Sequence, residues 1–390
     1  MANTNLKNAK DNQYDEFYTQ MSDIEAELKY YTNHFKGKTV FCNCDDPFES
    51  NFTLYFLMHF NKLGLKRLIS TGYATSPIAG RIIQQIGTYC LDVKNTKHVL
   101  RDGQKDLNAS DAKRMVQLDT KLIRIIEGDS EEIPAGDFRS TQSLELLSQA
   151  DIVVGNPPFS KFREYIALLE KYKKKYLFIG DINQITLKEF FPLILKGKVW
   201  MGMTMKGTGS HWFEVPPTYQ NSNVKIIDGK RMMTNGRACW WTNLDYPERH
   251  RVQPLGYQYH GNEEDYPKFD NYDAIDIGYY TKDGGRRGDF ERTPYDYEGM
   301  MAIPYTAFGK ICPEQFEILG ITQRNDDPYK TKKYTKEQYK NANDLNARGV
   351  IIINGVPKSM VARILVKNRH PYRNDWDAWQ KEIDESRKEK

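Results

Sequence analysis

The chain has 390 residues, of which 39% are hydrophobic and 13% aromatic, and its formal net charge is +4. This composition suits one large or two ordinary globular domains with a real hydrophobic core. Mean hydropathy is −0.71, and the sequence has no run of about eighteen apolar residues, which excludes a membrane-spanning helix. The first residues lack the apolar core of a signal peptide, so we expect a cytoplasmic protein.

Charge and cysteine content restrict the chemistry less strongly. A net charge of +4 neither supports nor excludes a nucleic-acid partner, because such proteins concentrate positive charge rather than merely carry a surplus. The five cysteines are scattered and show no zinc-binding spacing, so we expect reduced thiols and no metal site. They are Cys42, Cys44, Cys90, Cys239 and Cys312.

The first 250 residues predict strands that alternate with helices. Such alternation is typical of an α/β fold of the Rossmann-like kind, with a mostly parallel sheet and helices on both faces. We therefore expect one domain over residues 1–250. Apolar periodicity predicts strands at 38–43, 65–70, 122–126, 151–155, 176–180 and 199–203, and helices at 22–35, 51–63, 161–172 and 187–195.

After about residue 250 the composition changes. Tyr, Asp, Gly and Pro dominate residues 256–297, where little periodicity is present. Short strands are predicted again at 316–321, 349–355 and 361–366, and the charged residues at the carboxyl terminus suit either a helix or a tail. The sequence thus predicts a smaller, mixed region over residues 251–390.

The most informative motif is Asn156-Pro157-Pro158-Phe159, which follows the apolar run 150–155. Two successive prolines fix φ and lack N–H groups, so the chain must leave the sheet there as an extended turn. This turn lies at the carboxyl end of a predicted strand, where open α/β sheets bind ligands. An ordinary proline turn is the alternative interpretation.

The groups on this turn suit methyl transfer to an exocyclic amine. The N6 amino group of adenine is a poor nucleophile, because its lone pair is delocalised into the ring. The Asn156 side-chain oxygen and a backbone carbonyl of the turn could accept both N6 hydrogens, while Phe159 stacks on the base. The motif is similar to the signature of amino methyltransferases that use S-adenosylmethionine.

Three segments are candidates for binding the cofactor. The first follows the first strand and carries two carboxylates for the ribose or amino group, although Asp46 or Ser50 could instead cap a helix. The second could close over a methionine moiety. The third could bind the cofactor adenine, a role for which Gly128-Asp129 is a rival. In order, the segments are Asn43, Cys44, Asp45 and Asp46; Phe17, Tyr18 and Thr19; and Asp137 and Phe138.

These pieces, in this order, resemble the EcoRI-type family of adenine-specific DNA methyltransferases, which have the gamma arrangement. The resemblance runs from about residue 11 to 321. The segments that carry it are 15–20, 42–47 with 50–52, 136–140, 156–159 with 162–165, 241–245 and 313–318.

The resemblance implies a Rossmann-like methyltransferase fold and methyl transfer from S-adenosylmethionine, without a metal, to N6 of an adenine flipped out of duplex DNA. It implies catalytic roles for Asn156, Pro157, Pro158 and Phe159. Asp137 and Phe138 would bind the cofactor adenine, and residues 17–19 its methionine end. Two departures leave the ribose contacts open. The turn after the first strand lacks glycine, and Ser70-Thr71 stand where the broader class has an acidic residue.

We expect the region after residue 250 to recognise the DNA target, since its loops could enter the major groove. The expected partner is double-stranded DNA, with no membrane contact. We expect a monomer that does not physically require a cognate restriction endonuclease and that serves restriction-modification or the protection of phage or plasmid DNA. The basic candidates for DNA contact, each of which could instead be a solvated surface residue, are Arg286, Arg287, Arg363, Lys367 and Arg369.

Two other functions stay open from the sequence. The Asn-Pro-Pro-aromatic motif also serves RNA-adenine and protein-glutamine methyltransferases. A non-catalytic DNA-binding module with a decayed cofactor site is the second alternative. The large carboxyl-terminal region favours DNA as the substrate, and the intact residues 156–159 and 137–138 favour an enzyme. The recognition sequence cannot be read from the chain.

Overall fold

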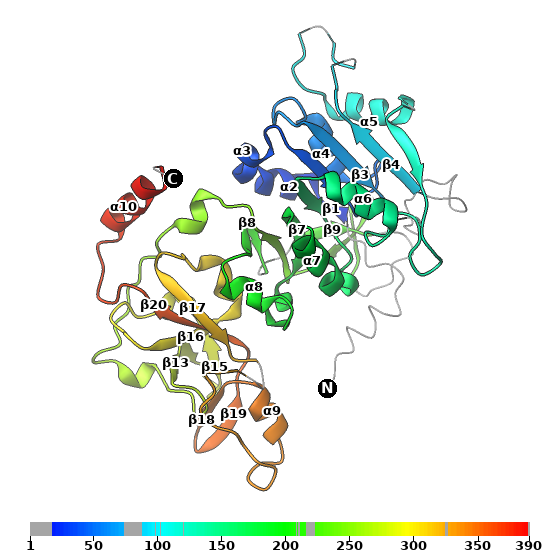
Figure 1. Cartoon of the computed structure of the whole chain (residues 1–390). Helices are drawn as coiled ribbons and strands as arrows, with labels where there is room; N and C mark the ends of the chain where they lie inside the picture. Colours follow the sequence, from blue (N-terminus) through cyan, green and yellow to red (C-terminus); the bar gives the residue numbers. More distant parts are fainter. Residues whose placement is uncertain are drawn as a thin grey trace. The chain divides into compact units, whose positions relative to one another are not determined.

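The computed structural model describes residues 18–73, 88–97, 99–101, 103–119, 121–207, 209, 211–215, 223–323 and 327–388. The chain divides into two compact units (Figure 1). The first unit takes in the chain up to Ile182 together with Val199–Asp245. The second unit consists of Asn183–Lys198 and the chain from Tyr246 onward.

An eight-stranded sheet forms the centre of the first unit, in the order β5-β4-β3-β2-β6-β7-β12-β8. The four central strands β3, β2, β6 and β7 are parallel. The strands on both flanks pair antiparallel. The bounds are β2 Thr39–Cys42, β3 Arg67–Thr71, β4 Thr88–Val93, β5 Ile123–Ile126, β6 Ile152–Gly155, β7 Lys175–Asp181, β8 Trp200–Lys206 and β12 Ala238–Thr242.

The expectation of an α/β fold is confirmed, but the expectation of a mostly parallel sheet is wrong outside the four central strands. Apolar periodicity identifies strands without giving their direction. Strands β4 and β12 were not predicted, and these two strands introduce the antiparallel pairings on the two flanks.

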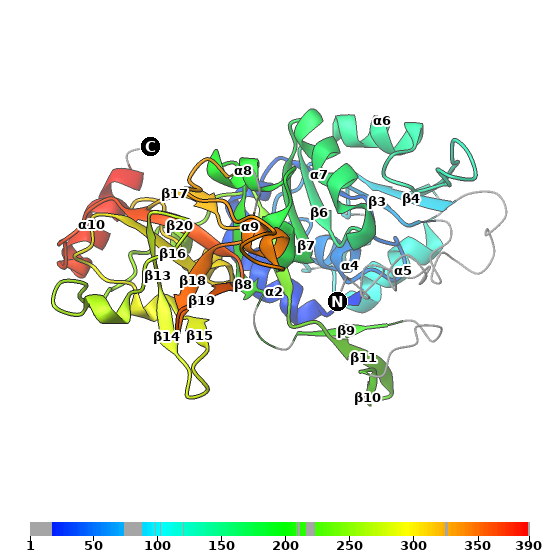
Figure 2. The same ribbon diagram turned by 90° about the horizontal axis from the view of Figure 1, so that it is seen from below.

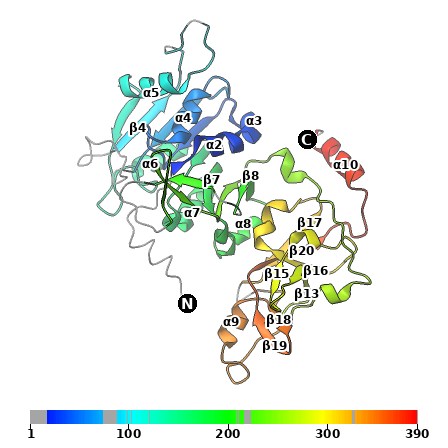
Figure 3. The same ribbon diagram turned by 180° about the vertical axis from the view of Figure 1, so that it is seen from behind.

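Helices cover both faces of this sheet. Figure 2 shows α6 and α7 on one side of the sheet and α2, α4 and α5 on the other. Helices α4 and α5 pack together (Figure 3). The predicted helices at 22–35, 51–63 and 161–172 are present, while α5 and α6 were not predicted. The bounds are α2 Met21–Leu28, α3 Thr32–Phe35, α4 Asn51–Met58, α5 Ala109–Leu118, α6 Thr141–Gln149 and α7 Phe162–Lys171.

The central strands form the core of this unit because their side chains are covered on both faces. All four residues of β2 and all four of β6 are buried. Continuous apolar runs of this kind are typical of parallel strands between two helical layers. Burial of each large apolar side chain contributes about 1.5–3 kcal/mol to stability, so these strands hold the carboxyl-end loops in place.

A second, antiparallel sheet belongs to the same unit, in the order β1-β9-β11-β10. Its strands are β1 Tyr18–Thr19, β9 Trp212–Glu214, β10 Lys225–Ile227 and β11 Lys230–Thr234. The turn between β10 and β11 has positive φ at both Asp228 (49°) and Gly229 (75°). Two residues of this conformation form the turn that best matches the twist of a hairpin.

The second unit has its own four-stranded sheet, in the order β13-β16-β20-β17, and two hairpins. The predicted strands near 316–321, 349–355 and 361–366 are present as β17, β18 and β20. The charged carboxyl-terminal segment is a helix, α10, whose Trp379 and Ile383 pack with Val252. The strands are β13 Ala274–Asp276, β14 Gly278–Tyr280, β15 Arg286–Gly288, β16 Met300–Pro304, β17 Phe316–Ile321, β18 Val350–Ile353, β19 Val356–Ser359 and β20 Arg363–Asn368.

The second unit contains three α-helices among its described residues, and short 3₁₀ helices occur along the whole described chain. The α-helices of the second unit are α8 Phe191–Leu195, α9 Ala342–Ala347 and α10 Trp376–Lys388. The 3₁₀ helices along the chain are η1 Lys29–Tyr31, η2 Phe159–Lys161, η3 Ile182–Thr186, η4 Pro247–His250, η5 Glu263–Asp265, η6 Phe290–Arg292 and η7 Tyr305–Lys310. Among the described residues, no helix is both long and apolar enough to cross a lipid bilayer.

Glu27 of α2 is fully buried and binds the edge strand β8. One carboxylate oxygen accepts from Tyr31 Oη (2.7 Å) and from the backbone N–H of Met203 (2.8 Å). The other accepts from the N–H (2.7 Å) and hydroxyl (2.6 Å) of Thr204. Backbone donors on a sheet edge otherwise lack partners, so Glu27 completes the hydrogen bonding of β8.

We predict that Glu27→Gln destabilises the protein, because its amide NH₂ would face donors that now meet a carboxylate oxygen. The expected loss is about 3 kcal/mol in the free energy of unfolding, measured by urea denaturation. Glu25→Gln is the matched control, since Glu25 is exposed on the same helix, and it should change stability by less than about 0.5 kcal/mol. Equal stability of the two variants would refute this role of Glu27.

Candidate functional site

The Asn156-Pro157-Pro158-Phe159 turn directly follows the buried strand β6, which confirms its predicted position. Pro158 has φ −63° and ψ 123°, an extended conformation, and η2 and α7 follow. Pro157 is buried, whereas Asn156, Pro158 and Phe159 are half-buried. The turn therefore leaves the sheet in the extended form that two prolines require.

Asp45 connects this turn to the two neighbouring strands. A side chain at Gly155 would place its Cβ 2.0 Å from Asp45 Oδ2, so only glycine allows this approach. The same oxygen lies 3.4 Å from the backbone N of Asn156, and Oδ1 accepts from Ser50 Oγ at 2.8 Å. The Asp45 backbone binds the end of β3, where its carbonyl accepts from Ser70 Oγ at 2.6 Å.

Asp46, the next residue, has one carboxylate oxygen that is unused. Oδ1 accepts from the N–H groups of Phe48 (2.8 Å) and Glu49 (3.1 Å). Oδ2 is buried and has no hydrogen-bond partner among the described residues, and it lies against Gly72 just after β3. Burial raises the pKa of the Asp46 carboxyl to about 6, although the two N–H donors act in the opposite direction. Thr71 Oγ1 is also buried, and no residue in the part of the chain that the structure describes forms a hydrogen bond with it.

Asp137 is buried and binds two cations. Oδ1 accepts from the backbone N–H and Nε of Arg139, each at 2.9 Å, while Oδ2 accepts from Arg139 Nη2 (2.8 Å) and Lys161 Nζ (3.0 Å). Burial opposes ionisation of Asp137, but these hydrogen bonds outweigh it and lower the pKa of its carboxyl. Because Lys161 follows the diproline turn, the ion pair joins residues 137–139 to that turn.

The neighbours of Asp137 are also close to the sheet. Gly136 has φ +75°, and a Cβ there would lie 1.9 Å from the carbonyl oxygen of Gly72. Phe138 is buried and packs edge-on against Tyr165, with ring centroids 5.2 Å apart. Asp129, the rival of Asp137, accepts from the N–H (2.9 Å) and hydroxyl (3.1 Å) of Thr141 at the start of α6.

The other residues proposed for the cofactor have varied surroundings. Asn43 is buried, and its Oδ1 accepts from Tyr165 Oη at 2.9 Å, while Cys44 is half-buried. Tyr18 and Thr19 form β1, and the Thr19 carbonyl accepts from Asn51 Nδ2 at 2.8 Å. Phe17 lies outside the described residues. The described residues contain no group of three or more potential ligands that could hold a metal.

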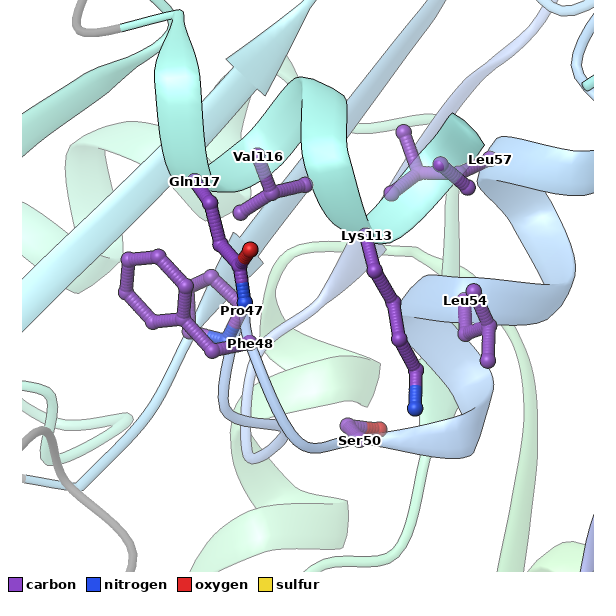
Figure 4. Close-up of a pocket in the computed structure, with 9 residues that line it drawn as sticks. Pro47, Phe48, Ser50, Leu54, Leu57, Lys113, Val116 and Gln117 are labelled. Carbon is purple, nitrogen blue, oxygen red and sulfur yellow. The ribbon is translucent and has the colours of Figure 1, made fainter. Parts of the chain in front are cut away.

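A small pocket lies between the loop that follows β2 and the helices α4 and α5. Figure 4 shows the Lys113 side chain of α5 extending toward Ser50. None of Asp45, Asp46 and Asn156 lines this pocket, so we do not place the substrate or the cofactor there. Its walls are Pro47, Phe48, Ser50, Leu54, Leu57, Ala112, Lys113, Val116 and Gln117.

Two of the five basic residues proposed for DNA contact are buried in the second unit. The side chain of Asp276 is fully buried, and it accepts from Arg286 Nε at 2.6 Å and from Arg363 Nε at 2.8 Å. Arg286 also donates to the carbonyls of Asp276 and Gly278. These contacts argue against direct DNA contacts by Arg286 and Arg363, because a buried guanidinium with such partners cannot reach a phosphate.

The three remaining candidates, Arg287, Lys367 and Arg369, are exposed. Arg287 lies on β15, opposite Tyr279 in the β14–β15 hairpin. Lys367 is on β20, between Met300 and Glu317 of the neighbouring strands. Arg369 Nε donates to the Pro313 carbonyl at 3.1 Å.

Sequence reasoning missed the roles of Arg139, Lys161 and Tyr165. Arg139 and Tyr165 stand in segments that carry the family resemblance, but no chemistry was assigned to them. Lys161 follows Phe159 by two residues, and that proximity was the available signal. Its pairing with Asp137 depends on a contact across 24 residues, which no local pattern predicts.

Comparisons with known proteins identify the family of the chain. The family model for the adenine-specific methyltransferase EcoRI matches residues 5–369. The type II methyltransferase M.EcoRI of Escherichia coli is 40% identical over 326 residues, which cover 83% of this chain and 90% of that protein. M.MgeORF184P of Mycoplasma genitalium is 32% identical and M.MpnI of Mycoplasma pneumoniae 29% identical, each over 93% of this chain and 97% of the relative.

No solved structure matches the chain. The family match nevertheless includes the diproline turn, the Asp45 loop and most of the second unit. This match confirms the resemblance predicted from the sequence. The chain therefore belongs to the EcoRI family of adenine-specific methyltransferases.

Proposed function

We propose that this methyltransferase modifies N6 of an adenine within a specific sequence of duplex DNA. Its role would be restriction-modification or the protection of phage or plasmid DNA. The observation that carries the proposal is the Asn156 turn at the carboxyl end of β6, next to Asp45 at the end of β2. Ligands of open α/β sheets bind at this edge.

The arrangement of strands supports a Rossmann-like methyltransferase fold for the first unit. Its four central strands are parallel, and β12 runs antiparallel between β7 and β8. We assign cofactor binding and catalysis to the region 1–250 and target recognition to 251–390. The exposed residues Arg287, Lys367 and Arg369 remain candidates for DNA contact.

The residues at the ends of β2 and β3 fit a nucleoside cofactor. Asp46 Oδ2 and Thr71 Oγ1 are buried and have no partner within the described residues, and ribose hydroxyls are donors that would satisfy them. We assign the ribose to Asp46, which lies against Gly72. Gly72 directly follows Ser70-Thr71, which stand where the broader class has an acidic residue at the end of the second strand. S-adenosylmethionine, when bound, supplies the methyl group, and no metal is required.

The remaining cofactor assignments follow from position. Asp137 is already saturated by Arg139 and Lys161, so we expect it to fix the loop beside the cofactor adenine rather than to bind the amino group directly. Phe138 would place an apolar side chain beside the cofactor adenine. Tyr18 and Thr19 remain candidates for the methionine end, and Asn43, Cys44 and Asp45 shape the floor of the site.

The catalytic turn would hold the flipped adenine. Asn156 Oδ1 and a backbone carbonyl accept the two N6 hydrogens, which increases the electron density on the nitrogen that is methylated. Extruding the base costs a few kcal/mol, and stacking on Phe159 returns roughly 1–3 kcal/mol of this. The carboxamide of Asn156 does not ionise, so it stays an acceptor across the working pH range.

Assays with competing substrates test the substrate class. We expect methylation of duplex DNA and N6-methyladenine at one sequence in treated genomic DNA, with structured RNA and proteins unmodified. We also expect a cytoplasmic enzyme that acts as a monomer and needs no bound endonuclease. Modification of RNA or protein alone would contradict the proposal, and so would a failure to bind S-adenosylmethionine.

Replacing Asn156 tests the catalytic turn. We predict that Asn156→Ala lowers kcat at least about 100-fold, because one acceptor for the N6 hydrogens is lost. Its Kd for S-adenosylmethionine, measured by calorimetry, should stay within about twofold of wild type. Asn95→Ala is the matched control, since Asn95 is an exposed asparagine of the same unit. Methylation at the wild-type rate by Asn156→Ala would show that the turn is not part of the active site.

Asp46 should make cofactor binding depend on pH. Its pKa is raised to about 6, so the carboxylate that accepts ribose hydroxyls becomes protonated as pH falls below 6. We predict that the Kd for S-adenosylmethionine rises about tenfold between pH 7 and pH 5. Asp46→Asn should bind weakly at both pH values. A Kd in the wild-type enzyme that does not vary with pH would contradict the ribose assignment.

Arg287 and Arg286 should respond differently to substitution. We predict that Arg287→Ala weakens binding to all DNA and reduces the salt slope by about 1, because a phosphate contact is lost. Arg286→Ala should instead destabilise the protein by about 3–5 kcal/mol, since it removes one partner of a buried ion pair. Salt-dependent DNA titration and urea unfolding measure the two effects. An unchanged salt slope for Arg287→Ala would exclude that residue from the DNA interface.

A further inference from the structure

The β10–β11 hairpin of the first unit exposes apolar side chains at its tip. All three residues of β10 are exposed, and Ile226 is 65% and Ile227 37% accessible. The base of the hairpin is different, because Val224 packs there against the buried residues Val215 and Met233. The hairpin thus has an anchored base and a tip whose isoleucines lie outside that cluster.

The tip also carries positive charge. Residues 225–231 contain the basic residues Lys225, Lys230 and Arg231 and one acidic residue, Asp228. Lys225 Nζ lies over the ring of Trp212, 5.7 Å from the ring centroid. Lys230 binds Glu214 at 2.6 Å, and its side chain is 57% exposed. An exposed apolar side chain can contact the bases of a nucleic acid, and lysines beside it can bind the phosphates. Contact with a nucleic acid is therefore more favourable for this tip than exposure to water.

A series of contacts connects the hairpin to the catalytic turn. Strand β11 lies beside β9 (Figure 2) and pairs with it. Strand β9 pairs in turn with β1, whose Thr19 carbonyl accepts from Asn51 Nδ2. Asn51 begins α4 next to Ser50, whose hydroxyl donates to Asp45. The small sheet is therefore attached to the loop that holds the Asn156 turn.

We propose that the β10–β11 hairpin contacts duplex DNA and that Ile226 enters the base stack where the target adenine leaves it. The inference rests on the proposed function. Proteins that distort DNA commonly insert an apolar side chain between base steps, and lysines nearby bind the phosphates. Duplex DNA is the favoured occupant over another protein chain, because the isoleucines are flanked by basic residues.

The experiment compares two substrates. Both are unmethylated duplexes. Each contains the recognition sequence, which is mapped from the positions of N6-methyladenine in treated genomic DNA. In one the target adenine faces thymine, and in the other it faces an abasic site, which lowers the cost of extrusion. The variants are Ile226→Ala and, as the matched control, Ile125→Ala, because Ile125 is an exposed isoleucine (48%) on β5 of the same unit.

We expect Ile226→Ala to lower the single-turnover rate at least about tenfold on the intact duplex. On the abasic duplex its rate should stay within about threefold of wild type, and its Kd for S-adenosylmethionine should not change. Ile125→Ala should match wild type on both substrates. This pattern distinguishes help with extrusion from a general loss of folding or of DNA affinity.

Three outcomes would overturn the inference. Wild-type rates for Ile226→Ala on the intact duplex would exclude a role in extrusion, and equal losses on both substrates would show a structural role. Association of the wild-type enzyme into dimers that Ile226→Ala abolishes would identify a second copy as the occupant. If the wild-type enzyme methylates neither duplex, the proposed function itself fails, which is a separate result.

Discussion

The contact between Asp45 and the Gly155-Asn156 peptide is the constraint on which the active-site arrangement depends. One carboxylate lies against a residue that has no side chain, accepts from Ser50 and faces the N–H of Asn156. The backbone of Asp45 is bound to β3 as well. The ends of three parallel strands are thereby fixed relative to one another, and the diproline turn extends from a rigid base.

Three aspartates of the site differ in their surroundings, and therefore in the roles available to them. Asp137 is saturated by Arg139 and Lys161, which keeps it ionised and makes it a structural link. Asp45 is occupied by its contacts within the sheet. Of the three, Asp46 has a raised pKa and a buried oxygen that no described residue contacts by a hydrogen bond, so it is the one suited to receive hydroxyl donors.

The turn, the central strands and the family were predictable because their signals are local. Consecutive prolines after an apolar strand determine the backbone of residues 156–159 with little help from the rest of the fold. Strand direction on the flanks depends on pairing between distant segments. The burial of Arg286 and Arg363 depends on Asp276, which is 87 residues from Arg363 in sequence. From the sequence alone, a basic residue is therefore predicted to be a surface group, because its partner in the folded structure is not known.

The way Asp276 binds two guanidinium groups has a consequence for how recognition could change among relatives. Arg286 is the first residue of β15, directly after the hairpin turn, and its guanidinium is fixed by Asp276. Among the described residues, the ion pairs of Asp276 are with Arg286 and Arg363, and they involve neither Arg287 nor Lys282 and the two glycines of the turn. Substitutions at the tip should therefore not change the free energy of unfolding of the unit. Libraries that vary only these outer positions should yield folded enzymes, and any change in their target preference can be selected without loss of the scaffold.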